Sequence, residues 1–130
     1  LLWNQAGCTP DDMDFVETYD DYPVISLMQL EDLGFFDKGG GADFIASHDL
    51  TCGGSFPHNT SGGQLSVGQA GAAGGFLGLV EAVRQLTGHA MGAAVPDARR
   101  ALVSGFGMVN YDRGICSAAA ILERVGDAHG

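Results

Sequence analysis

The first third of the chain shows two hydrophobic periods, one typical of a strand and one typical of a helix. Residues 13–19 alternate apolar and polar side chains, which predicts a short strand. After Asp20–Pro23, which suits a helix start because proline is tolerated in the first turn, apolar residues recur at helical spacing. The expected buried stripe of this helix consists of Val24, Leu27 and Met28. Gly34 is expected to end it.

The stretch of residues 59–75 begins with a polar turn, residues 59–63, and then becomes rich in very small side chains. The segment continues into a helix that ends near Gly88, and its expected buried face has the spacing i, i+3, i+4, i+7. That face consists of Phe76, Leu79, Val80 and Val83. Each glycine in a helix costs roughly 1 kcal/mol relative to alanine. So many glycines indicate close approach of the backbone, either to a ligand at the helix N-terminus or simply to a neighbouring sheet.

The remaining segments complete an α/β pattern. Residues 35–63 show no clear period, and we expect a long functional loop there. Residues 101–109 predict a buried strand, and residues 115–122 predict a closing strand of small and apolar side chains. The opening residues 1–5 are typical of the end of a helix, so we expect the chain to be a piece of a longer protein. The order of elements predicts a layered α/β fold.

Charge and composition narrow the classes of partner. The chain has sixteen carboxylates against six lysines and arginines, a net charge of -10. Eleven of the carboxylates lie between Asp11 and Asp49, where Lys38 is the only fixed cation. Nucleic-acid binding is disfavoured, since phosphate contacts need clustered Lys and Arg. The acidic face is expected to be solvated, with a basic protein partner as the alternative.

Several kinds of site are poorly supported by the sequence. The widely spaced Cys8, Cys52 and Cys116 indicate a reducing compartment, so we expect a cytoplasmic protein without a disulfide framework. There is no apolar run of membrane-spanning length. No Gly-Lys-Ser/Thr follows the glycines, which excludes a Walker-type phosphate loop. His48, Cys52 and His58 share one loop but do not make a four-ligand zinc pattern, so we expect no metal.

Polar side chains stand beside glycines at the ends of the predicted elements, where open α/β folds place ligands. They are Tyr19, Asp20, Gln69, Tyr111 and Asp112. Taken singly, each tyrosine is explained by a half-buried ring with its hydroxyl in water. Taken together with the glycine-rich helix, they indicate a site, because a tyrosine with a shifted pKa can transfer a proton.

Four segments match a known pattern in the same order. Residues 59–75 are similar to the thiolase signature N-x-x-G-G-x-x-x-x-G-H-P-x-G-x-x-G, and residues 15–22 resemble the strand that delivers the N-E-A-F or H-D-C-F box. Residues 29–34 are similar to the L-E-D-L-G segment of the sterol-carrier-protein-x and lipid-transfer-protein branch, and residues 119–124 resemble the last thiolase strand. The resemblance implies that residues 1–130 are the later part of a thiolase C-terminal half-domain, a mixed sheet packed by helices.

The resemblance implies a role for each matching position. Gln69 stands where the family has its catalytic histidine, and Tyr19 replaces the Asn or His that helps hold an oxyanion-hole water. Tyr111 falls at the position of the acid/base cysteine. The substrate-binding loop of the family is matched by Asn59, Gly62, Gly63 and Gly71.

These replacements alter the chemistry that the resemblance implies. Claisen condensation needs a thiolate-level base and a histidine, and both positions carry other groups here. The replacing residues resemble those of lipid-transfer-protein-type enzymes, which cleave β-hydroxyacyl-CoA thioesters by a retro-aldol step. In that step a tyrosine accepts the hydroxyl proton. The implied function is making or breaking a carbon–carbon bond in an acyl-CoA, by Claisen acyl transfer or retro-aldol cleavage. No cofactor is implied beyond the coenzyme A of the substrate.

The resemblance also implies partners. They are the N-terminal thiolase half, which carries the nucleophilic cysteine of the family, a second copy in a homodimer, and an OB-fold, zinc-ribbon companion subunit. Two alternatives remain open from the sequence. One is a non-catalytic thiolase-like subunit that binds acyl-CoA or scaffolds a partner, and the other is an α/β fragment without activity of its own.

Overall fold

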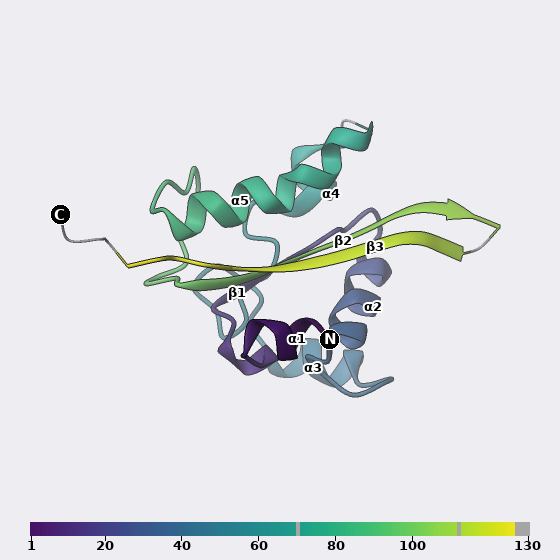
Figure 1. The fold of residues 1–130 in the computed structure, drawn as a ribbon, viewed down its shortest axis with the longest axis horizontal. Helices are drawn as coiled ribbons and strands as arrows, with labels where there is room; N and C mark the ends of the chain where they lie inside the picture. Colours follow the sequence, from purple (N-terminus) through teal and green to yellow (C-terminus); the bar gives the residue numbers. More distant parts are fainter. Residues whose placement is uncertain (70, 112, 127–130) are drawn as a thin grey trace.

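Three strands form one mixed sheet with helices on both faces (Figure 1). The computed structural model describes residues 1–69, 71–111 and 113–126. In chain order the elements are α1 (Leu2–Ala6), the 3₁₀ turn η1 (Pro10–Asp12), β1 (Phe15–Thr18), α2 (Pro23–Leu33), α3 (Gly41–Ser47), α4 (Gly63–Val67), η2 (Gly71–Phe76), α5 (Leu77–Leu86), β2 (Arg100–Asn110) and β3 (Arg113–Glu123). The predicted α/β layered fold is confirmed.

The sheet has the order β1-β2-β3. β1 runs parallel to β2, with Phe15 opposite Ala101 and Thr18 opposite Ser104. β2 and β3 are antiparallel and form a hairpin that runs well past the end of β1 (Figure 1). All three predicted strands are therefore confirmed, and the two C-terminal ones are longer at both ends than the sequence pattern indicates.

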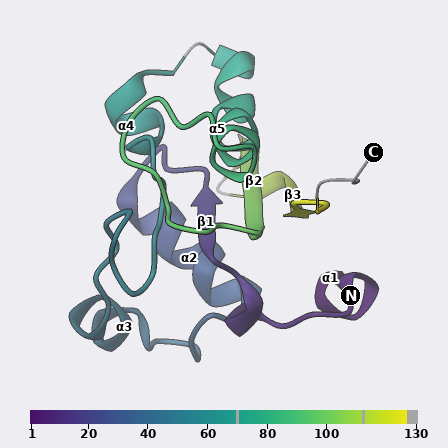
Figure 2. The ribbon, with the colours of Figure 1, turned by 90° about the vertical axis from the view of Figure 1, so that its left-hand side faces the viewer.

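The two faces of β1 are covered by different helices (Figures 1 and 2). Phe15 packs with Ala82 and Leu86 of α5, whereas Val16 packs with Leu30 of α2 and Phe44 of α3. All four residues of β1 are buried, as is usual for a strand in a parallel pair with both faces covered. The alternation of apolar and polar residues along residues 13–19 therefore does not divide β1 into a buried and an exposed face.

The bounds of α2 agree with the prediction, but its buried face does not. The helix begins at Pro23 and ends at Gly34, which adopts the left-handed conformation with φ 86°. Val24 and Met28 of the expected stripe are 60% and 54% exposed. The buried residues are Ser26 and Leu30, because α2 meets β1 partly through a polar contact that apolar spacing does not register.

The predicted glycine-rich helix is two pieces, η2 and α5, and the short helix α4 precedes them. Gly68 (φ 105°) ends α4 and Gly71 (φ 54°) opens η2, so the backbone turns twice where a continuous helix was expected. Leu79 is only partly buried, and three other members of the expected face are exposed. Those three are Phe76, Val80 and Val83.

The face of α5 that meets the sheet instead combines small and polar residues with Leu86. A Cβ at Gly78 would lie 3.2 Å from the Cβ of Glu17, so glycine permits the close approach of α5 to β1. Ala82 and Leu86 are buried beside Glu81 and Gln85. Tight helix–sheet packing, one of the two explanations offered for the glycines, therefore applies at Gly78.

The segment expected to be a long loop, residues 35–63, contains the helix α3. Its one buried residue, Phe44, packs against Phe36, Phe56 and His48 with ring centroids 4.2–4.9 Å apart. A single buried position leaves no hydrophobic period, which is why the pattern does not indicate this helix. A functional role for the remaining loop stays a prediction.

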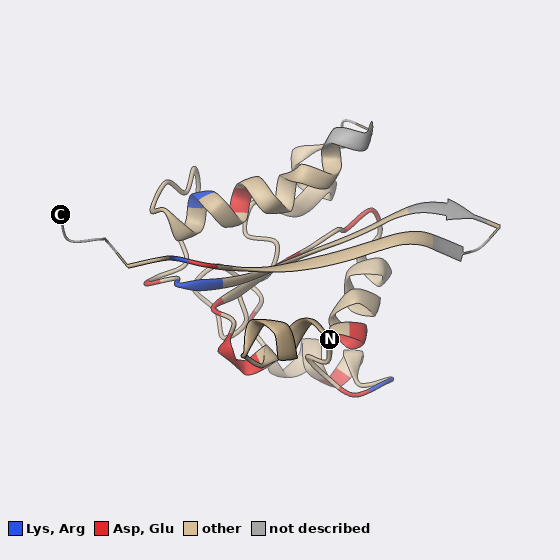
Figure 3. Cartoon of the chain, in the orientation of Figure 1, with Lys and Arg blue, Asp and Glu red and all other residues tan. Residues whose placement is uncertain are grey.

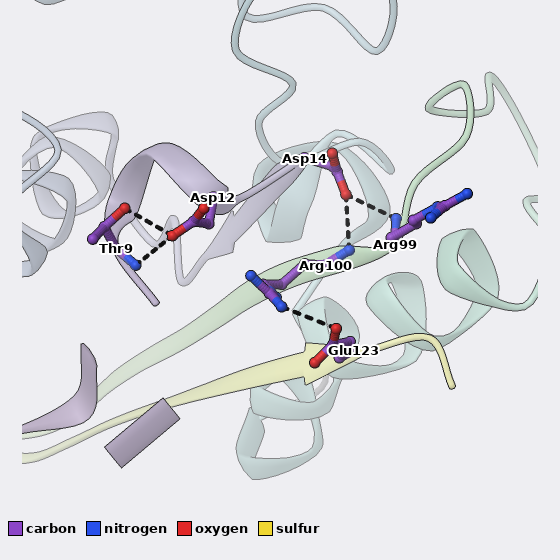
Figure 4. A network of polar contacts seen from close by, with 6 residues as sticks. All are labelled: Thr9, Asp12, Asp14, Arg99, Arg100 and Glu123. Carbon is purple, nitrogen blue, oxygen red and sulfur yellow. Dashed lines mark hydrogen bonds and ion pairs between the residues drawn. The ribbon is translucent and has the colours of Figure 1, made fainter. Parts of the chain in front are cut away.

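Polar contacts near the N-terminus cap η1 and attach the residue before β1 to the start of β2 (Figure 4). Asp12 accepts hydrogen bonds from the N–H and hydroxyl of Thr9 at 2.7 and 2.8 Å, which caps η1. Asp14 accepts the backbone N–H groups of Arg99 and Arg100, both at 2.8 Å. Figure 3 shows that acidic positions are common in the layer of η1, α2 and α3, where the solvated acidic face was expected.

Candidate functional site

Two of the side chains singled out in the sequence meet above the end of β1. Tyr19 is the residue after β1, and its backbone N–H donates to the Ser104 carbonyl at 3.1 Å. Gln69 lies just after α4 and donates its Nε2–H to the Tyr19 hydroxyl oxygen. The fold thus pairs two residues 50 positions apart, at the edge where open α/β sheets place ligands.

The Tyr19–Gln69 pair presents hydrogen-bond donors. Burial raises the pKa of Tyr19 above its usual value of 10.0, and the nearby Asp21 charge raises it further, against the smaller lowering by Gln69. The phenol is therefore neutral at pH 7 and keeps its O–H to donate. The Gln69 amide has a second hydrogen that is not used in its bond to Tyr19 and can be donated to an acceptor. Such a pair suits an oxyanion.

Asp20 and Gln64 join the end of β1 to the start of α4. The Asp20 carboxylate accepts the Gln64 N–H at 2.7 Å, and Gln64 in turn accepts the Asp20 N–H at 3.4 Å. A Cβ at Gly63 would lie 2.0 Å from the Asp20 carboxylate, so this glycine is required for the contact. Gln64 also donates to the Gly74 carbonyl at 2.9 Å, and a Cβ at Gly74 would crowd the Gln69 side chain at 3.1 Å. These contacts place Gln69 relative to Tyr19.

Asn59 fastens the glycine-containing loop to β1. Its Oδ1 accepts the Thr18 N–H at 2.8 Å, and its own N–H donates to the Val16 carbonyl at 3.0 Å. Gly62 adopts φ 89°, and a Cβ there would lie 2.7 Å from that of Ser66. Within the described residues, Asn59, Gly62 and Gly63 shape the loop. Direct contact of these residues and Gly71 with a substrate stays a prediction.

A buried acidic cluster lies beneath this loop. Glu17 accepts both the backbone N–H and the hydroxyl of Thr60, at 3.0 and 2.8 Å, and Glu81 lies 2.8 Å from the same hydroxyl. Gln85 donates to Glu81 at 2.8 Å. Burial raises the pKa of Glu17 to about 7, although the Thr60 hydrogen bonds lower it. Since the Thr60 hydroxyl has one hydrogen for two carboxyl oxygens, a protonated Glu17 completes the cluster at or below neutral pH.

A second polar group lies on the opposite face of β1. The Thr18 hydroxyl donates to Ser26 Oγ at 2.9 Å and lies 2.8 Å from His58 Nε2. Burial lowers the pKa of His58 to about 4, despite the Asp20 charge, so the imidazole is neutral. His58, Asp20 and Asn59 border a cavity of about 490 Å³ whose other walls are mainly apolar.

The structure does not bring Tyr111 to Tyr19 and Gln69. Tyr111 lies in the turn between β2 and β3, has φ 48° and is 91% exposed. It is seven residues beyond Ser104, which lies beside Tyr19. At about 3.3 Å per strand residue, the six steps from Ser104 to the end of β2 at Asn110 already span about 20 Å. Asp112 lies outside the described residues.

The histidines and cysteine considered for a metal have other partners. His48 stacks on Phe44, His58 bonds with Thr18, and Cys52 donates to the Thr60 carbonyl at 3.6 Å. Among the described residues there is no group of three or more His, Cys, Asp or Glu able to hold a metal ion. The helices of this part of the chain include none long and apolar enough to cross a membrane.

Sequence reasoning missed Glu17, Thr60 and Glu81. The alternation of apolar and polar residues gave no sign that Glu17 is buried, yet it is 1% exposed. One signal was present: a strand parallel to its neighbour, with helices before and after it, is covered on both faces. A glutamate in such a strand must be buried and must find partners.

Comparison with known proteins gives one family and a consistent set of relatives. Residues 3–124 match the profile described as thiolase C-terminal domain-like. The chain is 47% identical over 87 residues to the 17-hydroxy-3-oxo-4-pregnene-20-carboxyl-CoA lyase of Mycobacterium tuberculosis, covering 67% of this chain and 22% of the lyase. It is 35% identical over 106 residues to human sterol carrier protein 2, covering 82% of this chain and 19% of that protein.

A solved structure agrees with these relatives. The Ltp2-ChsH2(DUF35) aldolase superposes with a TM-score of 0.69 and 38% sequence identity, over 79% of this chain and 26% of that chain. The chain therefore spans about a fifth of the curated relatives described above, 22% and 19% of their lengths. The resemblance to the sterol-carrier and lipid-transfer branch is confirmed.

Proposed function

Because this chain belongs to the thiolase C-terminal domain-like family, we propose that it is the C-terminal part of an enzyme that cleaves a carbon–carbon bond in a β-hydroxyacyl-CoA by retro-aldol chemistry. The observation that carries the proposal is the Tyr19–Gln69 pair, which offers two donors at the end of β1 and lacks the histidine of Claisen enzymes. Relatives named as a lyase of a carboxyl-CoA and as a steroid side-chain-cleaving aldolase support the same reaction class.

The reaction balances with these groups as donors. A base removes the proton of the β-hydroxyl, and the bond between Cα and Cβ breaks as Cβ becomes a ketone or aldehyde carbonyl. The electron pair moves into the thioester, forming an enolate whose oxygen accepts hydrogen bonds from Tyr19 and Gln69. A proton delivered to Cα then gives the shortened acyl-CoA. Gln69 holds the oxygen without exchanging a proton, because an amide does not titrate near pH 7.

The proton acceptor is proposed to be Tyr111. The separation of about 20 Å along β2 requires the end of the β2–β3 hairpin to approach Gln69 when substrate is bound. Support for this role comes from the resemblance, which aligns Tyr111 with the acid/base cysteine of the family. The exposed location of Tyr111 in the β2–β3 turn does not itself support the role.

The whole protein is proposed to include an N-terminal thiolase half and to act in the cytoplasm as a homodimer. A companion subunit is proposed because the name of the similar aldolase joins two proteins. Claisen acyl transfer would need a nucleophilic cysteine in the N-terminal half, so sequencing that half separates the two chemistries.

The test is a turnover assay of the complete enzyme with a panel of β-hydroxyacyl-CoA thioesters. Release of a ketone or aldehyde together with a shorter acyl-CoA supports the proposal. The Gln69→Ala variant should lower kcat by about 100-fold, the usual loss when one oxyanion donor is removed. Binding of acyl-CoA without turnover would identify the protein as the non-catalytic subunit instead.

A further inference from the structure

The side-chain amide of Gln29 bonds to both backbone polar groups of Tyr19. Its Nε2 donates to the Tyr19 carbonyl at 2.6 Å, and its Oε1 accepts the Tyr19 N–H at 3.3 Å. We propose that Gln29 is a positioning residue that sets the place of Tyr19 in the active site. This inference rests on the proposed function, in which the Tyr19 hydroxyl must be correctly placed to donate to the enolate oxygen.

The Gln29 amide is itself held from two sides. Its Oε1 accepts the Ser104 hydroxyl at 2.8 Å, and its Nε2 donates a second hydrogen to the Ile25 carbonyl at 3.0 Å. Both hydrogens and both acceptor positions of the amide are thereby used. A glutamate has no hydrogen to donate when ionised, and an asparagine is one methylene shorter. Glutamine is thus the side chain that meets all four contacts from α2.

The Gln29 amide acts where β1 ends. Tyr19 is one residue past the last β1 position, and within the described part of the chain its backbone keeps one contact to the neighbouring strand, the N–H donated to the Ser104 carbonyl. Gln29 adds the link that the ladder no longer provides, and it ties α2, β2 and the backbone of Tyr19 together. The ring then extends to Gln69, which contacts the hydroxyl. Tyr19 is held at its backbone by Gln29 and at its hydroxyl by Gln69.

Small displacements of such a residue are costly for catalysis. A misplacement of 1 Å caused by a residue outside the chemistry can lower the rate by about 100-fold. Gln29 itself does not contact the Tyr19 hydroxyl, so its loss should act on kcat through Tyr19. A purely structural role would instead lower stability and leave the turnover of the folded enzyme unchanged.

The experiment uses Gln29→Met in the complete enzyme, because methionine keeps the length of the side chain without its hydrogen bonds. We expect kcat to fall between about tenfold and 100-fold, with a change in KM below about threefold. Gln29→Glu keeps the acceptor for Ser104 and Tyr19 but places a carboxylate oxygen against the Tyr19 and Ile25 carbonyls, so it should lose at least as much activity as Gln29→Met. Trp3→Phe is the matched control, since it removes another hydrogen bond to α2, from Nε1 to the Leu33 carbonyl at 2.9 Å, away from Tyr19.

A double-variant test separates positioning from stability. If Gln29 acts through Tyr19, adding Gln29→Met to Tyr19→Phe should lower kcat much less than it does in the unaltered enzyme. Equal losses in both backgrounds, or an equal loss in Trp3→Phe, would overturn the proposal.

A structural readout keeps this inference independent of the proposed reaction. A crystal structure of the Gln29→Met protein should show the Tyr19 hydroxyl out of hydrogen-bond reach of Gln69, with α2 intact. An unchanged Tyr19–Gln69 contact would overturn the positioning role. An absence of retro-aldol turnover in the unaltered enzyme would overturn the proposed function and leave this measurement valid.

Discussion

Glu17 and Thr60 join β1 to the loop of residues 59–63, because Glu17 Oε1 accepts both the backbone N–H and the hydroxyl of Thr60, at 3.0 and 2.8 Å. The glutamate is buried on the α5 face of β1, and burial raises its pKa to about 7. The contact therefore depends on pH within the physiological range.

The first prediction concerns the pH dependence of stability that Glu17 produces. Its folded-state pKa of about 7 exceeds the ordinary value of 4.5, so the folded protein binds more protons than the unfolded one between these values. The contribution of Glu17 to the free energy of unfolding is full below pH 4.5 and is lost as the pH rises through 7. At 1.36 kcal/mol per pKa unit, the loss is at most on the order of 3 kcal/mol. Urea midpoints of the unaltered protein and Glu17→Gln, measured from pH 4.5 to 8, check this.

The Glu17→Gln variant is a sharp comparison because its amide oxygen still accepts the Thr60 hydrogen bonds. The difference in unfolding free energy between the two proteins isolates the glutamate from other titrating groups. We expect the variant to gain relative stability as the pH rises toward 7. A difference that is constant across the series would contradict a raised Glu17 pKa.

The second prediction concerns His58, whose effect has the opposite sign. Burial lowers its pKa to about 4 from 6.5, so the unfolded chain binds the extra proton in this interval. Its contribution to stability is full above pH 6.5 and is lost as the pH falls toward 4. An NMR titration of the imidazole should find His58 neutral at pH 5.5. A His58 midpoint near the ordinary value of 6.5 would show that the imidazole is not desolvated.

Local signals predicted the bounds of α2. Pro23 and Gly34 delimit this helix, because proline and glycine act through backbone geometry that needs no tertiary context. The family motifs placed Tyr19 and Gln69 at the ends of elements, and the fold brings these two side chains into contact.

Buried faces could not be predicted in the same way. Val80 is apolar and exposed, whereas Glu81 is charged in sequence and buried, because the orientation of α5 is decided by the cluster of Thr60 and Glu17 across the interface. Such partners are distant in the chain, and apolar spacing carries no information about them. Gln29 escaped notice for the same reason, since its partner is backbone.

The third prediction tests the close approach at Gly63. A Cβ there would lie 2.0 Å from the Asp20 carboxylate, and the residue has φ 64°. Gly63→Ala should destabilise the protein by about 2 to 4 kcal/mol through overpacking and left-handed backbone strain. Gly75→Ala is the matched control, because no described atom lies within 4 Å of a Cβ there and no positive φ is involved. Equal urea midpoints for the two variants would refute the steric argument.

The last prediction separates the two tyrosines of the proposed site. Tyr19→Phe removes a donor that contacts Gln69, so kcat of the complete enzyme should fall by about 100-fold with a smaller change in KM. Tyr111→Phe should also lower turnover much more than binding if Tyr111 accepts the hydroxyl proton. Because Tyr111 is exposed and about 20 Å from Tyr19 along β2, its loss tests whether the hairpin end approaches the substrate. Single-turnover rates with a β-hydroxyacyl-CoA measure both effects. Unchanged turnover in Tyr111→Phe would remove Tyr111 from the mechanism. The proposed oxyanion site of Tyr19 and Gln69 would then depend only on the result for Tyr19→Phe.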